Sequence, residues 1–275
     1  MTLGIDIGGT NVSFGLVDEN VIQTSFSAPS FPADAGLEQT LETLSDHIRR
    51  IITPDTKKIG IGVPSVVDLK EGVVYDTQNI ASWKRVPLKS FLEDRFHIPV
   101  AVNNDANCYA LGVYAQYPAA AKPELLVTIT LGTGVGMGIV EEGRLFCGAN
   151  CGAGELGTLP YKDAAIEDYC GRHFFDAAGR DSREASEAAR NGDPAALALF
   201  DELGRHMGVL MSMVLFAYDP SHVAIGGGIA HNYSLFRPSM DRYLQEHFPY
   251  GKVLERLKVN IFTDHNIPVI GAALL

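Results

Sequence analysis

The chain has 275 residues, of which 46% are hydrophobic and 20% are charged, a composition typical of a globular protein and too apolar for a disordered one. Its 22 basic and 33 acidic side chains give a net charge of −11, which argues against non-specific binding to nucleic acids or anionic membranes. Four cysteines, no signal peptide at the start and no apolar stretch long enough to span a bilayer predict a cytoplasmic protein without a disulfide framework.

Strands and helices alternate in the first part of the sequence. Apolar runs at 3–7 and 12–17 predict two strands joined by the tight turn Gly8-Gly9-Thr10. Helical spacing of apolar residues, and short continuous apolar runs, predict the elements that follow. These are helices at 37–52, 86–96 and 106–117 and buried strands at 58–63 and 98–102.

The second part of the sequence begins with the same pattern. Two strands are predicted on either side of the turn Gly132-Thr133-Gly134, and a long helix from Asp193-Pro194 to Tyr218. The predicted elements are, in order, strands at 125–131 and 135–140, a loop-rich segment at 147–180, the long helix, strands at 223–225 and 253–262, and an apolar helix at 267–275.

The two glycine-rich hairpins match each other without a gap. At a constant offset of 123 residues, Gly9 meets Gly132 and Val12 meets Val135. This self-match indicates a duplicated unit, and the alternation of strands and helices indicates an α/β protein in two similar halves. We therefore expect the two hairpins to face each other across a cleft.

Glycine turns of this kind can bind phosphate through consecutive backbone N–H groups. Asp6, just before the first turn, could hold a hydrated Mg²⁺ ion, which prefers few protein ligands. An isolated Gly-Gly pair more often forms a plain hairpin turn. Because the turn is repeated in the second half, we favour a pair of turns that bind the two ends of one polyphosphate chain. The residues predicted to contact phosphates are Gly8, Gly9, Thr10 and Asn11 in the first turn and Gly132, Thr133 and Gly134 in the second.

Asn103-Asn104-Asp105 lies between a predicted buried strand and a predicted helix. Ligands of open α/β sheets bind at such carboxyl ends of strands. The Asp105 carboxylate could take the proton of an attacking hydroxyl during phosphoryl transfer. The alternative is that Asp105 only caps the helix that follows.

Two more glycine-rich segments are candidates. Glu155 lies in the stretch 148–157, where a lone Glu is more often solvated than functional. Gly226, Gly227 and Gly228 follow a predicted strand and would let a nucleoside lie against the backbone, although a turn explains them nearly as well.

The cysteines allow a loose zinc interpretation. Cys147 and Cys151 precede Cys170 and His173, and all four are residue types that ligate zinc. Their spacing is imperfect, so the preferred interpretation is free cysteines in the core or in loops.

Taken together, these motifs resemble the ROK family of sugar kinases, within the sugar kinase/actin/heat-shock ATPase superfamily. The segments that carry the resemblance are 6–10 and 131–136 for phosphates, 225–229 for adenosine, and 62–68, 79–83 and 103–107 on the sugar side. The resemblance implies a duplicated actin-like (ribonuclease H-like) ATPase fold with a cleft between two domains. These would be 1–118, joined by a C-terminal helix at about 263–275, and 119–262 with a sugar-side insertion.

The resemblance also implies an ATP-dependent hexose kinase that uses Mg²⁺. Asp105 would be the catalytic base, and Asn104 and Glu155 would hold other sugar hydroxyls. Ser65, Asn79 and Thr158 would line the same pocket. Glucose is the first expected substrate, while N-acetylmannosamine, N-acetylglucosamine and fructose, and polyphosphate as the donor, stay open. The expected partners are the sugar and ATP, without nucleic acid or membrane, and the resemblance implies a homodimer.

The sequence departs from the family pattern at the usual zinc site. Thr158 stands where the family usually has a His, and only Cys170-Gly171 remains of a cysteine-rich motif. We therefore expect no zinc and no second sugar-binding Glu, with Phe174 and Phe175 replacing the metal by apolar packing. Ser65 in place of a usual Gly adds a side chain beside the pocket, so altered sugar specificity is expected.

Two functions of other classes stay open. A sugar-responsive repressor of this family would carry an N-terminal helix-turn-helix, whereas this chain begins at the first phosphate strand and is acidic. A catalytically inactive sugar- or nucleotide-binding protein is disfavoured because Asp105 and both glycine turns are intact.

Overall fold

The computed structural model describes residues 1–32, 34–77 and 79–275, which divide into two compact units. The first unit comprises Met1–Lys122, Gly138–Ala153 and Asp264–Leu275, and the second comprises Pro123–Met137 and Gly154–Thr263. Strand β10 (Val135–Glu141) begins in the second unit and ends in the first. The predicted domain boundaries stay a prediction.

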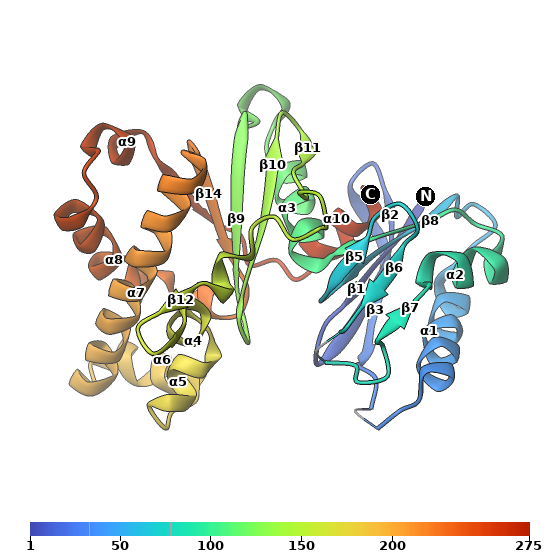
Figure 1. Cartoon of the computed structure of the whole chain (residues 1–275), viewed down its shortest axis with the longest axis horizontal. Helices are drawn as coiled ribbons and strands as arrows, with labels where there is room; N and C mark the ends of the chain where they lie inside the picture. The colour runs from blue at the N-terminus through green and yellow to red at the C-terminus, as the bar shows by residue number, and fades with distance from the viewer. Residues whose placement is uncertain (33, 78) are drawn as a thin grey trace. The chain divides into compact units, whose positions relative to one another are not determined.

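The first unit is built on a mixed five-stranded sheet with the order β3-β2-β1-β4-β8 (Figure 1). β1 (Thr2–Ile7) pairs in parallel with β4 (Lys58–Val63), which pairs in parallel with β8 (Val100–Asn104). β2 (Asn11–Asp18) and β3 (Val21–Pro29) add two antiparallel strands. The α/β class is therefore confirmed, but β8 lies two residues later than the predicted strand because its pairing with β4 continues to Asn104.

Helices cover both faces of this sheet (Figure 1). α1 (Leu37–Ile51) and α2 (Leu88–Phe96) lie on one face, and α3 (Asp105–Gln116) and α10 (Ile267–Ala273) on the other. α2 begins two residues later than predicted. Val86 precedes Pro87 and is held extended in the short strand β7 (Arg85–Val86), as residues before proline usually are.

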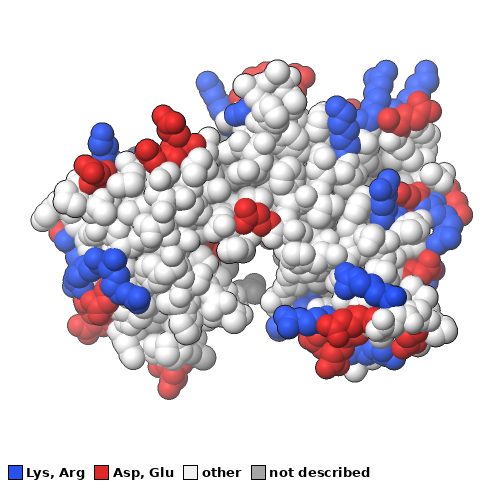
Figure 2. All heavy atoms as spheres, turned by 180° about the vertical axis from the view of Figure 1, so that it is seen from behind, with Lys and Arg blue, Asp and Glu red and all other residues white. Residues whose placement is uncertain are grey.

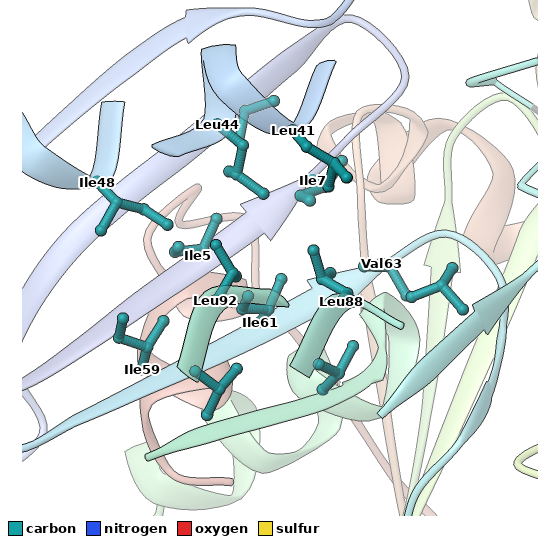
Figure 3. Close-up of a cluster of buried hydrophobic side chains, with 14 of the residues drawn as sticks. Ile5, Ile7, Leu41, Leu44, Ile48, Ile59, Ile61, Val63, Leu88 and Leu92 are labelled. Atoms are coloured by element: carbon teal, nitrogen blue, oxygen red, sulfur yellow. The ribbon is translucent and has the colours of Figure 1, made fainter. Parts of the chain in front are cut away.

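The core under α1 and α2 consists mainly of buried aliphatic side chains (Figure 3). Alternate residues of the strands point into it, and the helices contribute residues spaced by three or four. The labelled members are Ile5, Ile7, Ile59, Ile61 and Val63 from the strands and Leu41, Leu44, Ile48, Leu88 and Leu92 from the helices. Burial of such side chains contributes about 1.5–3 kcal/mol each.

Glycines in two neighbouring strands let α10 pack directly on the sheet backbone. A Cβ atom on Gly4 would lie 2.0 Å from the Val269 carbonyl oxygen. A Cβ atom on Gly60 would lie 1.8 Å from the Ala272 carbonyl oxygen. Because no side chain fits at these distances, only glycine permits this contact of α10 with β1 and β4.

A small three-stranded sheet completes the first unit, with the order β5-β6-β7. Its strands are β5 (Val66–Asp68), β6 (Val73–Tyr75) and β7 (Arg85–Val86). The Trp83 indole beside it is fully buried and donates a 2.7 Å hydrogen bond to Thr40 Oγ1 of α1. This bond satisfies the one polar atom of the largest buried side chain. The short helix η1 (Ala119–Ala121) follows α3.

The second large sheet repeats the strand order of the first, as the predicted duplication requires. Its order is β11-β10-β9-β14-β15, with β14 parallel to both of its neighbours. The strands are β9 (Leu125–Leu131), β11 (Arg144–Leu145), β14 (His222–Gly226) and β15 (Lys258–Ile261).

The helices of the second unit centre on the long α7 (Pro194–Tyr218), which Asp193 caps as predicted, and on α8 (Tyr233–His247), which packs along it. The other elements are η2 (Glu155–Thr158), β12 (Pro160–Tyr161), β13 (Ala164–Ala165), α4 (Ile166–Cys170), α5 (Arg172–Ala177), α6 (Ser182–Arg190), η3 (Ile229–Asn232) and α9 (Gly251–Arg256).

Two predictions for this unit were wrong. The segment 147–180 contains helices α4 and α5 rather than loops alone, and the strand predicted at 253–262 is helix α9 followed by the short β15. Helices of five or six residues complete too few turns to show a 3.6-residue period, so the pattern did not reveal them.

The described residues include no helix that is long and apolar enough to cross a membrane. On the face shown in Figure 2, acidic and basic side chains are interspersed. That face therefore has no broad basic patch that could bind a polyanion. The net charge of −11 also disfavours such binding.

Candidate functional site

The carboxyl ends of β1, β4 and β8 meet at one edge of the first sheet. Asp6 of β1 pairs with Gly62 of β4, and Gly62 pairs in turn with Asn103 of β8. A Cβ atom on Gly62 would lie 3.4 Å from Asp105 Cα, so the start of α3 packs directly on β4. The sheet thereby brings Asp6 and Asp105, which are far apart in sequence, close together.

Asp6 is partly buried at this edge. Burial, and secondarily the Asp105 carboxylate, raise the pKa of Asp6 to about 7. A divalent cation would relieve this repulsion, and one carboxylate supplemented by waters suits hydrated Mg²⁺. Asp6 therefore fits the predicted magnesium ligand. No cluster of three or more His, Cys, Asp or Glu suited to a metal occurs among the described residues.

Asn104, rather than Asp105, caps helix α3. Its Oδ1 accepts hydrogen bonds from Ala106 N at 2.9 Å and Asn107 N at 3.3 Å. The alternative that Asp105 serves as the cap is therefore wrong. Asp105 is the first helical residue, and its Oδ1 accepts from Ala106 N at 2.9 Å. The positive end of the helix dipole favours the ionised carboxylate there.

Three residues of the first unit that were predicted to contact the sugar lie near the carboxyl end of β8 or the first glycine turn. Asn104 Nδ2 donates to the Ser65 carbonyl oxygen at 3.3 Å, and the Ser65 hydroxyl donates to the Tyr75 carbonyl oxygen. The exposed Asn79 lies against the first glycine turn, because a Cβ atom on Gly9 would be 3.0 Å from Asn79 Nδ2. The structure brings Ser65 and Asn104 into contact, while their roles toward a sugar stay predictions.

The first glycine turn closes through a 2.9 Å hydrogen bond from Gly8 N to Asn11 O. Ser30, just beyond β3, holds the carbonyl side of the turn. Its backbone N donates to Thr10 O at 2.8 Å and its hydroxyl to Gly8 O at 2.9 Å. Gly9, Thr10 and Asn11 are exposed, which leaves this stretch open to a ligand such as phosphate.

The second glycine turn, in the second unit, is also held on its carbonyl side. Arg172 N, at the start of α5, donates to Gly132 O at 3.0 Å and to Thr133 O at 3.2 Å. Gly132 N donates to Gly134 O at 3.1 Å and closes the turn. Gly132 and Thr133 are exposed. Both predicted phosphate turns therefore have a similar construction, with their carbonyl groups bound by the protein.

Glu167, which the sequence did not single out, reaches the second turn from α4. Its Oε2 accepts from Val135 N at 3.2 Å, and a Cβ atom on Gly134 would lie only 2.2 Å from the same oxygen. Desolvation of its carboxyl group, followed by the Glu167 charge, raises the pKa of Glu155. A second carboxylate thus neighbours Glu155. The five-residue helix α4 shows no period that could have revealed it.

Glu155 and Thr158 occupy the two ends of helix η2. Both residues are exposed, and the Thr158 hydroxyl donates to the Glu155 carbonyl oxygen at 2.8 Å. Gly154 before them has a φ of 96°, a left-handed conformation that favours glycine. The structure thus places these two predicted sugar contacts side by side on one turn.

Gly226, Gly227 and Gly228 begin where β14 ends. Gly226 pairs with Thr130 of β9, so these glycines lie beside the strand that leads into the second turn. Gly227 has a φ of 84°, and its Cβ atom would lie 2.4 Å from the Leu131 carbonyl oxygen. Gly228 is exposed, with open space where a Cβ atom would be. The predicted nucleoside and phosphate segments therefore adjoin within this unit.

An aromatic cluster occupies the segment where the family resemblance implies zinc. Phe175 is fully buried, with its ring 5.3 Å from that of Phe174 and 5.6 Å from that of Phe200. Tyr161 Oη and His206 Nδ1 lie 3.0 Å apart beside them. This packing is what the predicted replacement of a metal by apolar contacts requires, while the absence of zinc stays a prediction.

Comparisons with known proteins agree on one family. A profile of the ROK family matches residues 2–174 and 176–275. The chain is 28% identical to a glucokinase of Streptomyces coelicolor, over 89% of this chain and 88% of that protein. It is 27% identical to an N-acetyl-D-glucosamine kinase of Vibrio cholerae, over 90% of each. A ROK family glucokinase from Streptomyces griseus, solved with glucose and AMPPNP, matches with a TM-score of 0.80 at 27% identity, over 99% of this chain and 97% of that one.

Proposed function

Because the chain belongs to the ROK family, we propose that it transfers the γ-phosphoryl group of ATP to a hydroxyl of a hexose. The resemblance inferred from the sequence is thereby confirmed at the level of the family. The observation that carries the proposed activity is the position of Asp105. It starts α3 at the carboxyl end of β8, beside Asp6 and the edge that bears the first glycine turn.

In the proposed reaction, Asp105 accepts the proton of the attacking sugar hydroxyl as the bond to phosphorus forms. Asn104 and the Ser65 backbone, already in contact, orient the sugar together with Asn79, Glu155 and Thr158. Phosphoryl transfer depends mainly on the positioning of the reactants and on the stabilisation of negative charge on the phosphates. In an acidic protein, backbone N–H groups and a cation can provide that stabilisation.

We propose that the two glycine turns bind the phosphates of one ATP molecule and that Gly226, Gly227 and Gly228 contact its adenosine. Their adjacency to the second turn through the pairing of Gly226 with Thr130 supports this assignment. A Mg²⁺ ion bound at Asp6 would neutralise charge on the phosphates. Polyphosphate, which offers the same phosphate chemistry without a base, is the alternative donor.

The relatives constrain the identity of the sugar less than they constrain the type of reaction. The two relatives named above are a glucokinase and an N-acetyl-D-glucosamine kinase, at nearly equal identity. We propose glucose as the first substrate to test, followed by N-acetylglucosamine, N-acetylmannosamine and fructose. We also propose a cytoplasmic homodimer, and light scattering on the purified protein tests its oligomeric state.

A coupled assay of ADP release over this panel of sugars tests the proposed function. Release that depends on both the protein and one sugar is the expected result, with a no-sugar reaction as the background. Polyphosphate replaces ATP in a parallel series that detects the sugar phosphate directly. Binding of sugar and AMPPNP without any turnover would instead identify a catalytically inactive binding protein.

A further inference from the structure

Two thiols lie together next to the proposed catalytic strand end. Cys147 and Cys151 belong to the loop that follows β11, and this loop is closed by a 3.2 Å hydrogen bond from Ala153 N to Cys147 O. Cys147 is partly exposed, whereas Cys151 is 3% exposed. Both sulfur atoms lie within 3.7 Å of the same atom, Asn107 Nδ2, so the two thiols lie side by side. They are therefore close enough to react with one another.

Both thiols contact the residues that flank Asn104 and Asp105. Asn107 Nδ2 lies 3.6 Å from Cys147 Sγ and 3.7 Å from Cys151 Sγ. The Cys151 thiol also lies 3.4 Å from Asn103 Oδ1, which in turn accepts from Asn104 N at 2.8 Å. A movement of either sulfur atom would therefore change contacts at the end of β8 and in the first turn of α3.

The surroundings shift the pKa values of the two thiols in opposite directions. Hydrogen bonds from Cys147, from the backbone N–H groups of Asn104 and Val67 and from the Asn107 amide lower the pKa of Cys151 to about 6. The hydrogen bond to Cys151, together with burial, raises the pKa of Cys147. Cys151 also has a φ of 58°, an uncommon left-handed conformation for a residue other than glycine.

We propose that Cys147 and Cys151 are a thiol switch, which a hydroperoxide closes to a disulfide and a dithiol reopens, and which turns off the proposed phosphorylation of sugar. The inference rests on the proposed function for its effect on activity, but not for the disulfide itself. It concerns the thiols alone and needs no metal.

The chemistry balances with hydrogen peroxide as the oxidant. The Cys151 thiolate attacks one peroxide oxygen, the O–O bond breaks, and Cys151 becomes a sulfenic acid as hydroxide leaves. The hydroxide takes the proton of the Cys147 thiol and becomes water. The Cys147 thiolate then attacks Cys151 Sγ, the S–O bond breaks, and the hydroxide that leaves takes up a proton from the solvent to form the second water.

Closure would disturb the strand end that carries Asp105. A disulfide holds its sulfurs about 2.05 Å apart, so at least one sulfur must leave its present contacts with Asn103 and Asn107. A misplacement of about 1 Å can cost about 10²-fold in rate when it displaces a reacting group. We therefore expect oxidation to lower sugar-dependent turnover about 10–100-fold and dithiothreitol to restore it.

Peptide mapping of the native wild-type protein tests the disulfide directly. After peroxide treatment, free thiols are alkylated in denaturant and the protein is digested with trypsin. The tryptic peptide 145–162 contains both cysteines and no other. We expect this peptide to be lighter by two hydrogen atoms and not alkylated, and to carry two alkyl groups after reduction.

Variants connect the disulfide to activity. Cys147→Ala is expected to make turnover resistant to peroxide at concentrations that inactivate the wild type. Cys170→Ala, which alters the buried cysteine of the second unit, is the matched control and is expected to stay sensitive.

Three results would overturn the inference. These are full alkylation of both cysteines after peroxide, oxidation of Cys151 to a sulfinic acid without a disulfide, and a mapped disulfide that leaves turnover unchanged. If the reduced protein phosphorylates no sugar, the proposed function fails, and the peptide masses alone still decide whether the disulfide forms.

Discussion

The proposed catalytic carboxylate depends on the residue before it. Asn104 satisfies the first N–H groups of α3, and Asp105 takes the first helical position, where the helix dipole favours its charged form. Asp6 lies close enough for its pKa to be raised partly by Asp105. At the end of β8, Asn104 thus has the structural role of capping α3, and Asp105 has the proposed chemical role.

Asp105→Asn tests the base directly. The amide keeps the shape of the side chain but cannot accept the hydroxyl proton, so turnover is expected to fall about 10²–10⁴-fold. Binding of AMPPNP and of the sugar, measured by calorimetry, is expected to persist. Asp94→Asn, on the exposed face of α2, is the matched control. Unchanged turnover in Asp105→Asn would remove Asp105 from the mechanism.

The raised pKa of Asp6 predicts a pH dependence of stability in metal-free buffer. The folded pKa of about 7 lies above the value of 3.8 for an unperturbed Asp, so the folded state binds the proton more tightly. The stability that this proton contributes is full below about pH 4 and is lost as pH rises through about 7. The wild type is expected to lose about 1–3 kcal/mol over this range relative to Asp6→Asn. Denaturant unfolding of both proteins in EDTA measures the difference, and parallel profiles would contradict it.

At the scale of elements, helix α10 packs on the two strands, β1 and β4, whose carboxyl ends form part of the candidate site. Its backbone touches β1 and β4 through Gly4 and Gly60, and its apolar residues Ile267, Val269 and Ala272 are almost fully buried. This contact lies behind the same strands that carry Asp6 and Gly62 at their carboxyl ends. Helix packing on one face therefore stabilises the edge at which the proposed chemistry occurs.

Gly60→Ala is expected to destabilise the protein by about 3 kcal/mol, because the new methyl group collides with the Ala272 carbonyl group. The matched control is Gly36→Ala at the start of α1, where φ is −68° and no atom lies within 4 Å of the added Cβ. Its effect is expected to stay within about 0.5 kcal/mol. Denaturant unfolding of the two variants measures both values, and equal stabilities would show that α10 tolerates displacement.

The aromatic cluster on α5 predicts a protein that is stable without zinc. Phe175 is fully buried against Phe200, so Phe175→Ala is expected to cost about 3–5 kcal/mol. Protein purified without chelator is expected to contain far less than one zinc per chain by elemental analysis, and EDTA should leave its melting temperature unchanged. Stoichiometric zinc would refute the idea that aromatic packing replaces the metal.

At the scale of the whole molecule, neither unit is a continuous piece of chain. The first unit needs the segment Asp264–Leu275 from the far end of the sequence, which supplies α10. The second is interrupted by Gly138–Ala153, a segment of the first unit that contains Cys147 and Cys151. A fragment cut at a single point therefore removes part of at least one core.

Deletion of residues 264–275 is expected to abolish cooperative folding of the first unit, because the faces of β1, β4 and α3 that α10 covers become exposed. Circular dichroism during thermal denaturation measures the effect. A chain that ends at Ala273 is the matched control, since it keeps all of α10 and loses only the final two residues. A cooperative transition of wild-type amplitude in the longer deletion would contradict the expectation.

The sequence by itself determined the strand-and-turn units, their duplication, the family and the candidate base. These rest on local patterns: alternating or continuous apolar runs, glycines at turns, and a carboxylate between a buried strand and a helix. A pattern of this kind is complete within a few residues, because strand and turn geometry repeats over two to four positions. Asp105 and the turn at 8–10 were found in this way.

Only the tertiary structure decided which groups meet. Glu167 reaches Val135, 32 positions away in the chain, and Cys151 meets Asn103, 48 positions away. Each of these contacts joins residues through a fold that no local period encodes. The short helices at 166–177 also needed the structure: α4 packs against α7, and Phe175 of α5 packs against Phe200 of α7, which no local period shows.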